Sequence, residues 1–192
     1  MAKIKYGLSN VHYAVATMGA NNTATYDTPV PIPGAVSLSL DAEGGSTNFY
    51  ADNIVYWTGT ANNGYTGSLE LALIPEDFEK DVLGFVSDGK KVLIEEVDAP
   101  VVHFALLFQF ENDTSNTRHV LYNCVASRPA VSGSTKEDSI EPQTETLNLT
   151  CIAIHNTTLD ADVVKAKTGS TTDSTTYSGW YSAVYTGTAP ST

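Results

Sequence analysis

The chain has 192 residues, enough for one domain with a sizeable core. Its formal net charge is −12, from 22 acidic residues against 10 Lys and Arg, and no Lys or Arg occurs between Tyr6 and Glu79. Tight nucleic-acid binding is therefore not expected, because that affinity comes mostly from cations that neutralise phosphates. Taken alone, the acidity is explained by solubility.

The first third of the chain reads as strands and connectors. Residues 3–17 mix apolar and polar side chains and predict a first strand or two. Three alternating prolines in residues 19–34 predict an extended surface connector, because proline cannot donate a hydrogen bond within a central strand. Residues 35–40 alternate and predict a strand. We expect residues 41–47 to form a flexible acidic loop and residues 49–58 to form one aromatic strand.

A strand that leads directly into a helix is predicted over residues 66–85. Leu69, Leu71 and Leu73 alternate with polar or small residues, which is the period of a half-buried strand. Pro75 suits the first position of a helix and is followed by acids, which the helix dipole favours there. Gly84 can adopt the left-handed conformation that ends a helix. We expect this helix, near residues 75–84, to be the main helix of an otherwise β protein.

The second half of the chain predicts further strands that pack into the same core. Strands 101–110 and 118–127 form the clearest pair and predict an antiparallel hairpin. A long polar loop separates this hairpin from a last strand. After His155 we expect a short helix over residues 160–166 and then a Thr/Ser/Gly-rich extension, partly docked through its aromatic residues. We therefore divide the chain into a domain at 1–155 and an extension at 156–192. The predicted strands are 92–97, 101–110, 118–127 and 146–155, and the loop is 129–145.

No motif for catalysis or metal binding is found in the sequence. The four histidines are scattered and read as surface or strand-face residues, and the two cysteines read as buried free thiols. Adjacent carboxylates point to opposite faces of a strand, so an acid pair would have to be assembled from distant strands, which the abundance of carboxylates leaves open. We expect no enzyme activity, cofactor or metal. The histidines are His12, His103, His119 and His155, and the cysteines are Cys124 and Cys151.

The N-terminus has no apolar signal core, and no stretch reaches the length of a membrane span. We therefore expect a protein that is made in a cytoplasm, is soluble there and does not contact membranes.

The order of these segments resembles the major tail protein, or tail tube protein, of long-tailed, siphovirus-type bacteriophages of Gram-positive hosts. The resemblance covers about residues 1–155. It rests on the order of the segments, of which the strand–helix element and the two strands within 101–127 are the most specific. The segments that carry it are Gly67–Gly84 (GSLELALIPEDFEKDVLG), Phe104–Phe110 (FALLFQF), His119–Ser127 (HVLYNCVAS) and Thr144–Ile154 (TETLNLTCIAI).

The resemblance implies a β-sandwich with one short flanking α-helix and long loops. It implies hexameric rings that stack into a hollow tail tube, with sheets of neighbouring subunits joined into one inner barrel around the channel. Expected partners are further copies of the chain, a tape measure protein and tail terminator or tip proteins, in a virion assembled in the host cytoplasm. Some members carry an added immunoglobulin-like C-terminal domain, and with 37 residues after His155 we do not expect its adhesion role here.

Two sets of residues become candidates for functional sites under this resemblance. Acids on the channel wall would repel the phosphates of passing DNA and prevent tight binding. Loops 41–48 and 131–144 are expected to reach subunits of the adjacent ring. The candidate channel-facing acids are Asp41, Glu43, Asp52, Glu70, Glu111 and Glu145, and the candidate inter-ring residues are Glu43, Gly44, Gly45, Ser46, Lys136, Glu137 and Asp138.

An alternative from another class is a monomeric or trimeric β-sandwich that binds carbohydrate or a receptor at a phage tail tip. Exposed tyrosines with Trp57 or Trp180 would then stack on sugar rings. Packing in a core or an interface is the more ordinary use of such aromatic residues.

Overall fold

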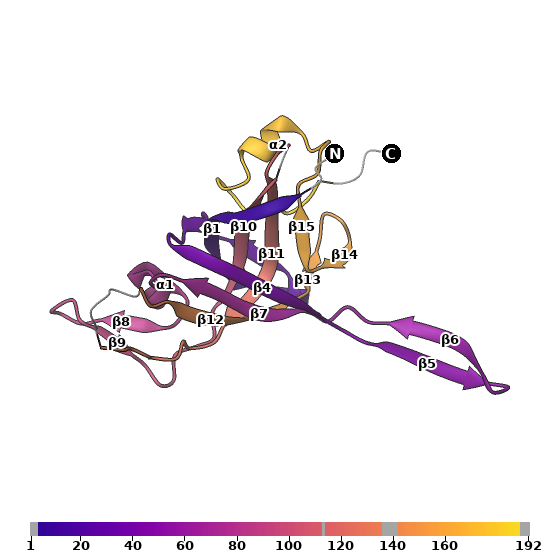
Figure 1. Ribbon diagram of the computed structural model, residues 1–192, viewed down its shortest axis with the longest axis horizontal. Helices are drawn as coiled ribbons and strands as arrows, with labels where there is room; N and C mark the ends of the chain where they lie inside the picture. Colours follow the sequence, from indigo (N-terminus) through magenta and orange to yellow (C-terminus); the bar gives the residue numbers. More distant parts are fainter. Residues whose placement is uncertain (1–3, 113, 136–141, 189–192) are drawn as a thin grey trace.

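The computed structural model describes residues 4–112, 114–135 and 142–188 (Figure 1). Most of the ordered chain is β-strand, so the predicted mainly β class is confirmed. The first seven strands are β1 (Lys5–Met18), β2 (Ala24–Tyr26), β3 (Val30–Pro31), β4 (Ala35–Glu43), β5 (Ser46–Ala51), β6 (Ile54–Thr60) and β7 (Gly64–Leu71). The others are β8 (Phe85–Ser87), β9 (Leu93–Glu95), β10 (His103–Asn112), β11 (Thr117–Ala126), β12 (Glu145–Ile152), β13 (Ile154–Asn156), β14 (Ala161–Val163) and β15 (Lys165–Lys167). A short 3-10 turn, η1 (Ala20–Asn22), precedes β2.

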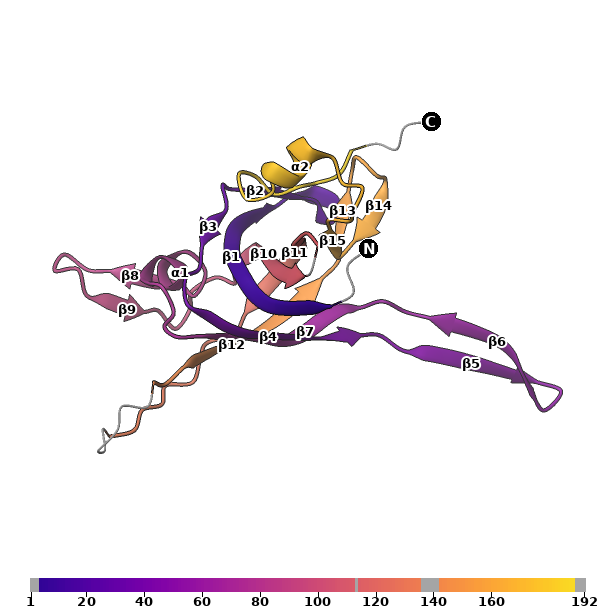
Figure 2. The ribbon, with the colours of Figure 1, turned by 45° about the horizontal axis from the view of Figure 1, so that its top comes forward.

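One nine-stranded antiparallel sheet organises the molecule. Its main path runs β2-β1-β10-β11-β12-β7-β4, with β3 paired to β1 and β15 paired to β11. The sheet curls strongly, and Figure 2 shows β1 wrapping around the interior. The curl brings β1 close to β4, although the two strands lie near opposite ends of the path. Two halves of the same sheet therefore face each other across a core, as the layers of a sandwich do.

The interior of the curled sheet holds the main hydrophobic core. Leu69 and Leu71 of β7 and Phe104 and Leu106 of β10 point into it and are fully buried. The helix α1 (Glu76–Asp81) closes one end of this core with Phe78. The predicted helix near residues 75–84 is thus present, and Gly84 has the expected positive φ of +77°.

A second core covers the outer face of β10 and β11. It contains Leu107 of β10, Tyr122 of β11 and Trp180 from the segment after β15. This segment includes a second short helix, α2 (Ser174–Ser178), which the sequence analysis did not predict. Both faces of β10 are therefore buried, which explains its nearly continuous run of apolar residues.

The short helix predicted over residues 160–166 is wrong. Residues 161–163 form β14 and residues 165–167 form β15. β15 pairs with the first half of β11, in register Val120↔Ala166. Pairing with β11 supplies the backbone hydrogen bonds of β15. A helix of this length would be only marginally stable by itself, so the strand is favoured.

Candidate assembly surfaces

A long two-stranded arm projects from the body of the molecule. In the part of the chain that the structure describes, β5 and β6 pair only with each other, and both views place them far from the sheet (Figures 1 and 2). The turn at its tip consists of Asp52 and Asn53, with φ values of +51° and +62°, as in the tight turns that suit hairpins. The single aromatic strand predicted over residues 49–58 is therefore wrong, because the chain reverses at Asp52.

The arm continues the β4–β7 hairpin. β4 extends to Glu43, so the predicted flexible loop over residues 41–47 is wrong, and only Gly44 and Gly45 separate β4 from β5. The amide of Ala61 donates to the carbonyl of Gly45, and the amide of Asn63 donates to the carbonyl of Glu43. Gly44 has a φ of +149°, and a Cβ there would lie 2.1 Å from the carbonyl oxygen of Ala61, so only glycine fits. The arm is hydrogen-bonded to the body through this junction.

The arm is covered with exposed apolar side chains. Tyr56 is 70% exposed and Trp57 is 58% exposed, although aromatic residues of this size are normally covered. An isolated two-stranded hairpin is only marginally stable in water. Such a surface indicates an interaction site. Its exposed members are Phe49, Tyr50, Ile54, Val55, Tyr56 and Trp57.

A polar sheet face lies beside the base of the arm. The outward side chains of β4, β7 and β12 alternate with inward leucines and are mostly hydroxyls, amides and acids, whereas Val36 and Ile152 are exposed apolar residues on these strands. Three of the predicted channel-facing acids lie on this face, namely Asp41, Glu43 and Glu70. The cross-strand register forms three rows across β4, β7 and β12, each with its β7 residue in the middle: Ser37–Glu70–Thr146, Ser39–Ser68–Asn148 and Asp41–Thr66–Thr150. None of these outward positions is Lys or Arg.

Hydroxyl groups hold two of these carboxylates in place. Glu70 accepts hydrogen bonds from the hydroxyls of Thr144 at 2.6 Å and Ser37 at 2.8 Å. These bonds, Thr144 first, lower the pKa of the Glu70 carboxyl because they stabilise its charged form. Glu43 accepts a 2.6 Å hydrogen bond from Thr66. The face is therefore negatively charged at neutral pH, and Glu43 and Glu70 are held to the sheet.

The other predicted channel-facing acids are placed elsewhere. Asp52 lies at the tip of the arm, and Glu111 lies at the end of β10 in the other half of the sheet. Glu145 accepts a 2.7 Å hydrogen bond from the amide of Ile74 and so supports the passage from β7 to α1. The sequence did not show which acids share a face, because that depends on the pairing of β7 with both β4 and β12.

The predicted inter-ring residues fall into two groups. Glu43, Gly44, Gly45 and Ser46 form the junction between β4 and the arm. Lys136, Glu137 and Asp138 lie outside the described residues. The loop prediction missed the arm itself, and the available signal was two apolar runs separated by two turn-compatible residues, Asp52 and Asn53.

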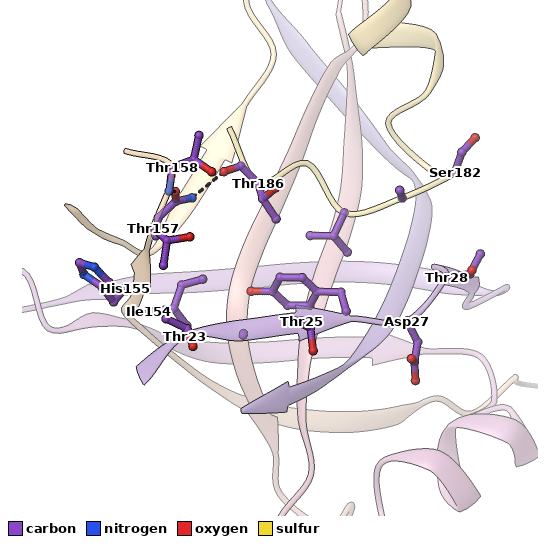
Figure 3. Close-up of a pocket in the computed structure, with 15 residues that line it drawn as sticks. Thr23, Thr25, Asp27, Thr28, Ile154, His155, Thr157, Thr158, Ser182 and Thr186 are labelled. Carbon is purple, nitrogen blue, oxygen red and sulfur yellow. Dashed lines mark hydrogen bonds between the residues drawn. The ribbon is translucent and has the colours of Figure 1, made fainter. Parts of the chain in front are cut away.

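A hollow of about 380 Å³ lies between β2 and the C-terminal segment (Figure 3). Its lining consists mainly of threonines and backbone, and a hydrogen bond from Asn156 to the carbonyl of Thr186 fixes one wall. Asp27 and His155 lie at opposite ends of the hollow in Figure 3. His155 is instead close to Asp160 and Asp162. This hollow does not bring an acid and a base together.

The cysteines face each other inside the main core. Cys124 and Cys151 occupy paired positions on β11 and β12, are buried and have sulfurs 2.8 Å apart. Burial raises the pKa of the Cys124 thiol well above its ordinary value. Over the described ranges, no cluster of His, Cys, Asp and Glu could hold a metal ion. The same ranges contain no helix with the length and apolar character to cross a bilayer.

Comparisons with known proteins give no family for this chain. A scan against models of protein families finds no match, and a search of curated proteins finds no similar sequence.

Proposed function

We propose that this protein is a structural component of a bacteriophage tail. Copies join into hexameric rings, and the rings stack into the tail tube through which DNA passes during genome ejection. The uncovered β5–β6 arm carries the proposal, because its exposed aromatic residues need a partner surface. The order of segments that resembles tail tube proteins of siphovirus-type phages supports the same function.

A second copy of the chain is the partner that the proposal assigns to the arm. A ring of six copies needs a heterologous contact, in which the arm of each copy binds a different patch on the next copy. Heterologous contacts form closed rings or extended assemblies, and both are needed to build a tube. Joining the sheets of neighbouring copies would also pair exposed strand edges, which otherwise promote aggregation.

The polar face of β4, β7 and β12 is assigned to the channel. Asp41, Glu43 and Glu70 would repel DNA phosphates at short range, where charges are not screened by salt. The hydroxyl and amide groups around them keep the wall hydrated, and no outward position on it is Lys or Arg. DNA would therefore pass without binding tightly. By the same resemblance, a tape measure protein and tail terminator or tip proteins are further partners, and the protein is part of the virion after assembly in the host cytoplasm.

Negative-stain electron microscopy and sedimentation of concentrated purified protein test the proposal. Wild-type protein is expected to form rings or tubes of uniform diameter. The triple variant Phe49→Ser, Tyr56→Ser, Trp57→Ser is expected to remain monomeric with an unchanged fold, because these side chains make no core contact. A matched control, Val97→Ser with Val101→Ser, alters exposed apolar residues outside the arm and outside the predicted inter-ring loops, and should assemble normally. Wild-type protein that stays monomeric at all concentrations would refute self-assembly.

The alternative is a carbohydrate- or receptor-binding module of a tail tip. Tyr56 and Trp57 on the arm are exposed enough to stack on sugars, whereas Trp180 is 3% exposed and donates to the carbonyl of His119. Trp180 is therefore not available for that role. Dispersed particles that bind glycans through Trp57 would favour this alternative over the tube.

A further inference from the structure

A crevice lined by lysines opens at the mouth of the curled sheet. It consists of two adjoining hollows of about 360 and 420 Å³, which share Lys5, Phe110 and His119. Lys165 borders the first hollow and Lys167 borders the second. The floor of the first hollow includes the apolar side chains of Leu38, Leu40 and Phe108. We call this site the lysine crevice.

Within residues 4–112, 114–135 and 142–188, no acidic side chain forms an ion pair with any of the three lysines of the crevice. Every ion pair among the described residues involves Lys80, Arg128 or His155 instead. The ammonium of Lys5 lies 4.2 Å from the centre of the Phe110 ring, and that of Lys165 lies 4.3 Å from the centre of the Tyr65 ring. These contacts hold the ammonium groups near the apolar floor but leave their charge uncompensated.

His119 between them adds no positive charge at neutral pH. Burial first, and then the charges of Lys167, Lys165 and Lys5, which disfavour a fourth cation, lower the pKa of His119 to about 4. Its ring stacks on Phe108 and meets Phe110 edge-on. The crevice therefore combines an apolar floor with a rim of three cations, in a chain whose net charge is −12. It suits an apolar segment that carries a carboxylate.

The tip of the arm combines apolar side chains with one carboxylate. Asp52 is the only charged residue between Ser46 and Thr60, and it lies at the turn. Tyr50 and Ile54 flank the turn and are exposed. Figures 1 and 2 show the arm pointing away from the body, so it does not approach the crevice of its own chain.

We propose that the arm tip of one copy inserts into the lysine crevice of a second copy. The Asp52 carboxylate lies among the ammonium groups of Lys5, Lys165 and Lys167, while Tyr50 and Ile54 cover the apolar floor. This inference rests on the proposed self-assembly and names the surface that receives the arm. In the proposed ring, each copy gives its arm to one neighbour and receives the arm of another.

Charge reversal of both sides tests the pairing. Asp52→Lys, and separately Lys165→Glu with Lys167→Glu, are expected to weaken self-association on the order of tenfold to a hundredfold, measured by sedimentation velocity. The variant that carries all three changes should recover most of the association, because the charges are complementary again. Matched controls are Asp41→Lys, an acid outside the arm, and Lys90→Glu with Lys91→Glu, two lysines outside the crevice. The controls should change association much less, and circular dichroism checks the fold of every variant.

Other outcomes separate this inference from the proposed function. Wild-type rings or tubes that are unaffected by the reversals at Asp52 and the lysines would overturn the pairing and leave the tube proposal standing. Loss of assembly in the lysine variant alone, with Asp52→Lys unaffected, would mean that another acidic group occupies the crevice and would also overturn it. If the variant that combines Asp52→Lys, Lys165→Glu and Lys167→Glu does not recover self-association, the direct contact is overturned. Wild-type protein that never self-associates would instead refute the proposed function.

Discussion

The hydroxyl of Tyr13 in β1 donates a 2.7 Å hydrogen bond to the carboxylate of Asp81 at the end of α1. Tyr13 is 1% exposed, and its ring meets that of Phe78 edge-on with centroids 5.1 Å apart. Burial, and then the bond to Asp81, raise the pKa of the Tyr13 hydroxyl. This contact attaches a helix too short to be stable alone to the curled sheet.

The two partners of this bond are not equivalent, which gives a first prediction. Tyr13→Phe removes a buried donor and leaves Asp81 in water, so we expect a loss of about 1 kcal/mol in the free energy of unfolding. Asp81→Ala leaves the buried Tyr13 hydroxyl without an acceptor and should cost about 1–3 kcal/mol. Urea unfolding measures both, with the exposed Glu76→Ala as a control that should change stability by less than about 0.5 kcal/mol. A larger loss in Tyr13→Phe than in Asp81→Ala would contradict this reasoning.

The strand–helix element could be predicted because its signals are local. The alternation of Leu69 and Leu71, the proline at 75 and the glycine at 84 each act within a few residues. The arm could not be recognised in the same way, because Gly44 and Gly45 resemble a flexible loop and the turn at Asp52 interrupts a run of aromatic residues. The turn-compatible pair Asp52–Asn53 was the local signal for the hairpin, whereas the order of its base depends on hydrogen bonds across the junction.

The acidic face depended on long-range pairing. Strand alternation shows that Asp41 and Glu70 each oppose leucines, but not that they share a surface. That follows from the antiparallel pairing of β4 with β7 on either side of the arm, which sets Asp41 opposite Thr66 and Ser37 opposite Glu70. The burial of Trp180 could not be predicted locally for the same reason, since its partners on β10 and β11 precede it by about sixty residues or more.

Docking of the C-terminal segment gives a second prediction. Trp180 stacks on Tyr185, and the carbonyl of Tyr185 accepts a 2.8 Å hydrogen bond from Tyr122. Trp180→Ala should therefore lower the free energy of unfolding by about 3–5 kcal/mol and expose Leu107 to solvent. Urea unfolding and binding of a dye specific for apolar surface measure the two effects. The exposed Trp57→Ala serves as the matched tryptophan control and should leave the stability of the monomer unchanged. Equal stability of the two variants would show that the segment does not contribute to the fold.

A third prediction concerns the polar face and rests on the proposed tube. Replacing Asp41, Glu43 and Glu70 with Lys should slow genome ejection without stopping tube assembly, because cations on the channel wall would bind DNA phosphates. The rate of ejection is measured as the rate at which assembled phage release their DNA. Lys replacements at Glu76, Glu96 and Asp98, which are off this face, make the same change in net charge and should eject normally. An unchanged ejection rate in the first variant would count against a channel role for this face.

The pH dependence of stability gives a fourth prediction through His119. The pKa of a histidine in an unfolded chain is about 6.5, and in the folded protein the pKa of His119 is about 4. Between these values the unfolded chain takes up a proton that folded His119 does not. Stability contributed by neutral His119 is therefore complete above pH 6.5 and is lost as the pH falls toward 4.

The size of this loss can be measured against a variant that does not titrate. Between pH 7 and pH 5, wild-type protein should lose on the order of 1–2 kcal/mol more than His119→Gln, a range that allows for solvent screening of a partly exposed ring. Urea unfolding at both pH values measures the difference, and His12→Gln is a matched control with a histidine outside the crevice. Replacing Lys165 and Lys167 with Gln should reduce the effect, because these lysines help to keep His119 neutral. The same pH dependence in wild type and His119→Gln would show that His119 can be protonated without cost, and that the three lysines do not act on it as a cluster.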